Sequence, residues 1–160
     1  MTTDRYCIDT SSLIHAWRRS YPIRNFQPVW DYIDSLIEAG RLYSSMEVLK
    51  EIERRDDELH EWTKKRKEIF LDIEGDELQI RMKEILDRYP RLVDTRKNRS
   101  GADPFVIAIA SLYDPRLVVI TEERPTGNIE KPNIPDVCTV EGLNHVSVLG
   151  LIVQEDWRLK

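Results

Sequence analysis

The stretch ADPFVIAIA, residues 102–110, places an aspartate and a proline directly before an almost wholly apolar run. Asp103 is a preferred type of helix N-cap and Pro104 suits the first helical position, so the pattern predicts a helix from Pro104 to about Leu112. This helix would be apolar on every side, which is not compatible with a position on the surface. We therefore expect it to pack against a sheet.

The next apolar segment, LVVI at residues 117–120, predicts a strand of that sheet. It is a short β-branched run, which is typical of a parallel strand buried on both faces. Other strands are predicted at residues 5–9, 41–44 and 145–149, and amphipathic helices at residues 26–39 and 46–54.

Two segments complete the pattern. Between Asp56 and Tyr89, two charged amphipathic stretches with Gly75 between them predict a helical hairpin. Prolines and a glycine predict a long surface loop over residues 125–135. The order of elements predicts the α/β class: a three-layer α/β/α sandwich with a mostly parallel sheet, the hairpin inserted, and residues 1–160 in a single domain.

Composition limits the classes of protein that the chain can belong to. No apolar run approaches the ~20 residues that span a bilayer, and the first residues lack the basic segment and apolar core of a secretory signal, so we expect a cytoplasmic protein that makes no membrane contact. Cys7 and Cys138 form no C-x-x-C pair, and the three histidines have no metal-ligand spacing. Any catalysis must then use carboxylates.

The formal net charge of −5 argues against a protein that holds nucleic acid by general phosphate neutralisation. Local basic clusters remain as candidates for such contacts. They are Arg18 with Arg19, the run at residues 64–67, and the group at residues 96–99, and each of them also suits an ordinary solvated surface.

Acidic residues end or follow three of the predicted strands, and another begins the helix that packs on the sheet. They are Asp9, Glu47, Glu51, Asp103, Glu122 and Glu123. The carboxyl ends of parallel strands meet at one edge of a sheet, so these side chains should gather there. Several carboxylates without basic partners repel one another, and a hard divalent cation such as Mg²⁺ or Mn²⁺ would neutralise them.

Each acid also has a purely structural interpretation. Asp9 and Asp103 suit helix caps, Glu47 and Glu51 suit a helix surface, and Glu122 with Glu123 suits a solvated strand end. Independent structural acids need not gather at one sheet edge, however. Their shared position favours the joint metal-site interpretation.

Four segments resemble the successive acid motifs of PIN-domain nucleases: YCIDTSSLI, SSMEVLKEI, ADPFVIAIA and VVITEE. The segment IPDVC, residues 134–138, looks like the mark of a PIN-like subgroup. The resemblance implies an α/β/α sandwich whose acids bind Mg²⁺ or Mn²⁺ and hydrolyse RNA or DNA phosphodiesters. Many members are ribonuclease toxins of VapC-type, type II toxin–antitoxin pairs, so it also implies RNA as substrate and an antitoxin as a protein partner.

Position by position, the resemblance assigns four acids as metal ligands and catalytic residues. They are Asp9, Glu51, Asp103 and Glu123, with Glu47 as the fallback for the second and Glu122 for the fourth. The family usually has aspartate at the fourth position, so Glu123 departs from the pattern by one methylene.

The same comparison assigns supporting residues. Thr10 or Ser11 is the hydroxyl that accompanies the first acid, and Ser11 and Thr121 would orient ligands or water. Arg99 and Arg124 are the candidate substrate-binding residues at the rim.

Three other classes compete with the nuclease. A phosphotransferase of the haloacid dehalogenase type needs an acid where Ser11 stands, and a receiver domain needs a lysine where the chain has TEER. A PIN-like scaffold that binds RNA or a protein without cutting fits better, because a fold does not fix a function. We also expect a homodimer. Trp30 and Trp62 suit a surface that binds a second copy or an antitoxin, but a position in the hydrophobic core is the simpler interpretation.

Overall fold

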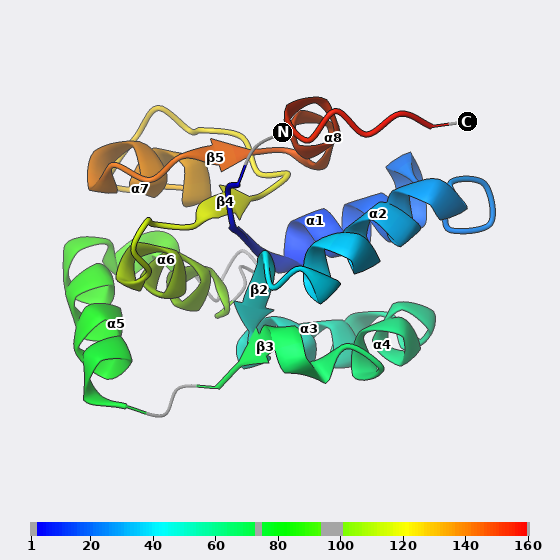
Figure 1. The fold of residues 1–160 in the computed structure, drawn as a ribbon. Coiled ribbons are helices and arrows are strands. Elements are labelled where there is room, and N and C mark those ends of the chain that lie inside the picture. Colours follow the sequence, from blue (N-terminus) through cyan, green and yellow to red (C-terminus); the bar gives the residue numbers. More distant parts are fainter. Residues whose placement is uncertain (1–2, 73–74, 94–100, 160) are drawn as a thin grey trace.

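The computed structural model describes residues 3–72, 75–93 and 101–159. At its centre lies a five-stranded sheet in the order β3-β2-β1-β4-β5, in which each neighbouring pair is parallel (Figure 1). The strands are β1 (Tyr6–Ile8), β2 (Leu42–Ser45), β3 (Phe70–Leu71), β4 (Val118–Ile120) and β5 (His145–Val146). The predicted α/β class with a parallel sheet is confirmed.

The two central strands are the apolar runs that the sequence indicated. In β1 and β4 each residue is buried, and Ile8 pairs with Ile120. The Asp9 N–H donates to the Ile120 carbonyl at 3.0 Å, so the pairing continues one residue beyond the strand. The sheet thereby fixes the backbone of Asp9.

Helices cover the two faces of the sheet and form the outer layers of the sandwich (Figure 1). One side carries α1 (Thr10–His15), α2 (Gln27–Glu38), α3 (Met46–Arg55) and α4 (Asp57–Lys64). The other side carries α5 (Asp76–Arg88), α6 (Asp103–Leu112) and α7 (Ile134–Glu141). The chain proceeds from β1 toward β3 in one direction and from β4 to β5 in the other. Ligands of such sheets bind where the direction reverses, here between β1 and β4.

Both helical layers bury apolar surface against the sheet. Helix α6 packs on β1, β2 and β4, as its apolar composition predicted. On the other face, the Trp30 ring lies 5.1 Å from that of Trp17 and 5.0 Å from that of Trp62 between centroids. Trp30 and Trp62 are both buried, so they belong to the core and not to a dimer or antitoxin face.

The predicted helical hairpin is wrong in one respect. Its two helices exist as α4 and α5, but the 3₁₀ turn η2 (Lys67–Ile69) and the strand β3 separate them. Phe70 is buried and pairs with Ser44 of β2, so this apolar pair extends the sheet instead of forming a turn between helices. A two-residue strand is too short to leave a periodic pattern in the sequence.

The predicted loop over residues 125–135 ends earlier than expected, because α7 begins at Ile134. Asn133 and Asp136 form a reciprocal capping box, Pro135 lies in the first turn, and Gly142 ends the helix in a left-handed conformation. Proline is compatible with a first helical turn, where its missing N–H would have no partner in any case. The prolines were therefore interpreted as a loop, although one of them, Pro135, belongs to the first turn of α7.

The tail forms β5 and then α8 (Val148–Gln154), with Ser147 as N-cap and Gly150 inside the helix. The strand is shorter than the predicted residues 145–149. Across the described ranges, each helix is too short or too polar to cross a membrane.

Candidate functional site

Asp9 lies at the carboxyl end of the central strand β1 and is almost wholly buried, with 1% of its surface exposed. It is the N-cap of α1, since its Oδ1 accepts the Ser12 N–H at 2.8 Å. Its Oδ2 accepts the hydroxyls of Ser11 at 2.8 Å and Thr121 at 2.6 Å. The cap interpretation is therefore confirmed, and it leaves the carboxylate at the reversal point of the sheet.

Burial raises the pKa of Asp9 to about 6, because desolvation disfavours the charged form. The hydrogen bonds from Thr121, Ser12 and Ser11 act in the opposite direction, and the nearby charge of Glu123 raises the pKa further. A buried carboxylate with a perturbed pKa at a ligand-binding edge is a recognised mark of a functional site.

Two hydroxyl groups connect Asp9 to the turn that follows β4. Ser11 Oγ accepts the Glu122 N–H at 3.2 Å, and Thr121 Oγ1 accepts the Glu123 N–H at 3.1 Å. Each hydroxyl thus donates to Asp9 and accepts from the turn. The structure brings Ser11 and Thr121 to the first acid as the sequence analysis expected, whereas the Thr10 hydroxyl is buried and has no hydrogen-bond partner among the described residues.

The two fourth-acid candidates have their carboxyl groups on helix N-termini. Glu122 Oε1 accepts the Val148 N–H of α8 at 2.8 Å, and Glu123 Oε1 accepts the Ile134 N–H of α7 at 3.0 Å. Such positions stabilise negative charge, because the first N–H groups of a helix have no partner within it. Glu123 lies close enough to Asp9 to raise its pKa, which favours it over Glu122 as the fourth acid.

On α3, the structure separates the two second-acid candidates by burial. Glu51 is 8% exposed, whereas Glu47 lies at the surface of the helix and pairs with Lys50 at 3.1 Å. Helix α3 packs against α1, the helix that Asp9 caps. Glu51 is therefore the better candidate.

Asp103 is buried, with 4% of its surface exposed, but it is not the N-cap of its helix. Ala102 is the N-cap, and Asp103 is the first residue of α6, so the predicted boundary was one residue late. At the far end of α6, the Ala110 carbonyl accepts the Leu117 N–H just before β4, so the helix runs antiparallel to that strand. Its N-terminus and Asp103 therefore lie toward the carboxyl edge of the sheet, where Asp9 lies.

The segment IPDVC forms the start of α7, and its aspartate holds the loop before that helix. Asp136 accepts N–H groups from Thr126, Gly127 and Asn133 at 2.8–3.1 Å, and these bonds hold its pKa below the usual range. The loop begins directly after Glu123. Sequence reasoning missed this role, although the spacing N-x-x-D was a signal for it.

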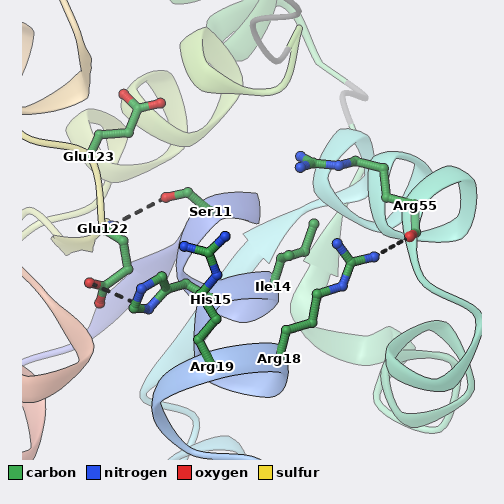
Figure 2. A pocket seen from close by; sticks show the side chains of 8 residues that line it. All are labelled: Ser11, Ile14, His15, Arg18, Arg19, Arg55, Glu122 and Glu123. Atoms are coloured by element: carbon green, nitrogen blue, oxygen red, sulfur yellow. Dashed lines mark hydrogen bonds and ion pairs between the residues drawn. The ribbon is translucent and has the colours of Figure 1, made fainter.

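A cleft of about 320 Å³ opens beside this network (Figure 2). Ser11, Glu122 and Glu123 line it together with Ile14, His15 and three arginines, Arg18, Arg19 and Arg55. His15 Nδ1 lies 4.0 Å from Glu122 Oε2. The sequence analysis identified Arg18 and Arg19 as a basic cluster. No pattern in the sequence predicted that Arg55 lies near them.

The sequence placed two arginines, Arg99 and Arg124, at the rim of the site. Arg99 lies outside the described residues. Arg124 lines a second hollow of about 530 Å³ with Thr121, Glu122 and Glu123, and its carbonyl accepts Asn133 Nδ2 at 2.7 Å. The same hollow is lined by residues of β5 and α8, so Arg124 borders the candidate site on that side.

The chain is an α/β/α protein whose candidate site is a buried carboxylate at the reversal point of a parallel sheet. It belongs to the family described as a domain of unknown function, DUF4411, whose model matches residues 6–159. No curated protein matches the chain.

Proposed function

We propose that the protein is a metal-dependent nuclease of the PIN-like class, and more specifically an endoribonuclease that hydrolyses RNA phosphodiester bonds. The observation that carries the proposal is Asp9, a buried carboxylate with a pKa of about 6 at the carboxyl ends of the two central strands. Two hydroxyls from different parts of the chain fix its orientation. A buried carboxylate with a perturbed pKa at this edge of a parallel sheet is typical of a functional site.

The donor set suits a hard divalent cation, Mg²⁺ or Mn²⁺. Asp9, Glu51 and Asp103 are buried carboxylates, and such oxygens are what these ions prefer. Among the described residues, no three acidic, histidine or cysteine side chains surround a common point. Mg²⁺ does not require such a group, because it keeps several waters and is often held by one or two carboxylates.

In this proposal, Asp9 is the principal ligand, and Glu51 and Asp103 contribute directly or through ordered water. When bound, the cation lowers the pKa of a water molecule and polarises the scissile phosphate. Ser11 and Thr121 hold Asp9 Oδ2 in place, so that the carboxylate keeps one orientation. One carboxylate oxygen of Glu123 accepts the Ile134 N–H of α7, and its second oxygen would contact water or the metal.

The test is cleavage of mixed RNA by the purified protein in Mg²⁺ or Mn²⁺, with EDTA and the Asp9→Asn and Asp103→Asn variants beside it. We expect cleavage that needs the metal and falls by at least about 10²-fold in each variant, as losses of single catalytic groups commonly do. Cleavage that survives both substitutions would refute the assigned site.

The competing function is a PIN-like scaffold that binds RNA or a protein and does not cut. It is favoured by one observation: the carboxyl groups of Glu122 and Glu123 both serve helix N-termini. Calorimetry with Mn²⁺ separates the two, using Glu123→Gln, which keeps an acceptor for the Ile134 N–H but removes the charge. A nuclease binds Mn²⁺ and binds it less tightly after this change; an inert scaffold shows no heat of binding in either form.

The same proposal includes a cytoplasmic location, an antitoxin as partner and a homodimer. Because Trp30 and Trp62 are internal, a partner must use another surface. Leu149 and Val153 of α8 are 60% and 70% exposed and lie one helical turn apart, which makes α8 the first place to test. Co-purification with the product of the adjacent gene, lost on Leu149→Ser, is the expected result.

A further inference from the structure

Arg18, Arg19 and Arg55 bring three positive charges into one cleft of a protein whose net charge is −5. Figure 2 shows the side chains of Arg19 and Arg55 extending into the cleft, whereas Arg18 is directed toward the Arg55 carbonyl. Like charges repel, so such a convergence costs free energy unless something else stabilises it. Glu122 and Glu123 line the other wall of the cleft, so the arginine side is the part that is suited to an anion.

One of the three arginines has protein partners and the other two do not. The Arg18 Nε donates to Asp56 Oδ2 at 2.7 Å, and its terminal nitrogen donates to the Arg55 carbonyl. Arg19 and Arg55 are exposed, and neither guanidinium makes a hydrogen bond or ion pair with any residue in the described part of the chain. Arg18 is thus fixed, while Arg19 and Arg55 are open to a ligand.

The backbone at this point is unusual. Directly after α1, residues Ala16–Ser20 form a π-helical segment, η1, in which the Tyr21 N–H donates to the Ala16 carbonyl at 2.9 Å. Such wide turns are rare in proteins as a whole, and those that occur are often found at functional sites. Here the wide turn carries Arg18 and Arg19 on the side of the molecule that faces Arg55.

The cleft is also connected to the buried carboxylate. Ser11 lines the cleft, and its hydroxyl donates to Asp9 Oδ2 at 2.8 Å. Ser11 thus joins the cleft to the hydrogen bonds of Asp9. The volume of about 320 Å³ is that of a small-ligand pocket, so it can receive part of a single strand but not a duplex.

We propose that this cleft binds the phosphodiester backbone of a single-stranded nucleic acid, with Arg19 and Arg55 contacting successive phosphates and Arg18 positioning the Arg55 end of the cleft. The inference rests on the proposed nuclease function, because it supplies the strand on which Asp9 would act. Guanidinium forks match phosphate oxygens in geometry as well as in charge.

Binding of a short fluorescein-labelled single-stranded RNA, followed by anisotropy in EDTA, tests the proposal without any cleavage. Each phosphate contact on a single strand contributes about 0.7 to the slope of log affinity against log salt. Removing two contacts in Arg19→Ala/Arg55→Ala should therefore lower the slope by about 1.4. With equal affinities of parent and variant at ~1 M salt, the corresponding loss of affinity is about 14-fold at ~0.15 M salt and about 66-fold at ~0.05 M salt.

The matched control is Arg81→Ala/Arg158→Ala, which removes the same charge from surface pairs with Glu84 and Asp156. We expect this control to bind RNA within about twofold of the parent, since its arginines contact no phosphate. Arg19→Lys/Arg55→Lys should keep the salt slope and lose part of the affinity, because lysine keeps the charge without the fork. All variants should unfold at the parent's temperature.

Four outcomes decide the proposal. A loss of RNA binding in the Arg19→Ala/Arg55→Ala variant, but not in the control, supports the proposal. If the parent protein binds RNA in this way but does not cut it with Mg²⁺, the RNA-binding proposal stands and only the nuclease function is refuted. An equal loss in the control, or no RNA binding by the parent, overturns the RNA-binding proposal. Full cleavage activity in the Arg19→Ala/Arg55→Ala variant overturns it as well, while leaving the nuclease function in place.

Discussion

In the absence of metal, Asp9→Asn should be more stable than the parent protein, and this difference in stability should be larger at high pH than at low pH. The pKa of Asp9 is raised from 3.8 to about 6 in the folded protein. The folded state therefore binds the proton more tightly than the unfolded chain does, and stability falls as the pH rises from about 4 through about 6. Asparagine keeps the shape of the side chain and carries no charge to desolvate.

The magnitude follows from the shift of roughly two units, since each unit corresponds to about 1.4 kcal/mol. Well above pH 6 the ionised Asp9 thus costs the parent about 3 kcal/mol. About half of that cost is already present near pH 5, because the unfolded carboxyl ionises near 4. The advantage of the variant should therefore widen by about 1.4 kcal/mol between about pH 5 and about pH 8.

Urea unfolding in EDTA at the two pH values measures this change, and thermal unfolding should show it as a shift of about 3–6 °C. Asp31→Asn is the control, since it removes the same charge from an exposed position. Mg²⁺ should then stabilise the parent but not Asp9→Asn, because a ligand that binds only the folded state shifts the unfolding equilibrium. A stability difference that is equal at both pH values, or smaller at pH 8, would show that burial does not raise the pKa of Asp9.

Three further changes have definite expected results. Thr121→Val removes the 2.6 Å hydrogen bond that lowers the pKa of Asp9, so the pKa should rise above 6, as an NMR titration of that carboxyl would show. Asp136→Ala should cost about 1–3 kcal/mol near pH 7 in urea unfolding. Because the pKa of Asp136 is lowered in the folded state, its contribution is present above the unfolded value and is lost as the pH falls below about 4. Trp30→Ala should cost about 3–5 kcal/mol at any pH in the same assay, since the ring is fully buried between two other tryptophans.

The sequence was sufficient for the central part of the fold, because that part depends on local pattern. The runs YCI and VVI are apolar and bounded by polar residues, and both form buried strands. Asp9 and Thr121 directly follow these strands, so the rule that parallel strands end at one edge predicts that the two side chains lie together. Their hydrogen bond confirms that rule in this chain.

What the sequence could not provide depends on contacts between distant segments. The carboxyl groups of Glu122 and Glu123 are directed by the N-termini of α8 and α7, and the α7 start was hidden among prolines. Arg55 reaches the cleft of Arg19 only because α3 packs against α1, a contact that spacing along the chain does not reveal. Side-chain direction at a strand end is set by its neighbours in space and not by the residues beside it in sequence.

Ser11 is the residue at which the two parts of the proposed site meet. Its hydroxyl donates to Asp9 and accepts from the turn after β4, and the same residue lines the arginine cleft. Asp9 caps α1, and the arginines Arg18 and Arg19 lie on η1, which continues that helix without a break. One continuous segment therefore sets the distance between the carboxylate and the two arginines. A change that moves this segment should weaken metal binding and RNA binding together, whereas a change confined to Glu123 should weaken metal binding alone.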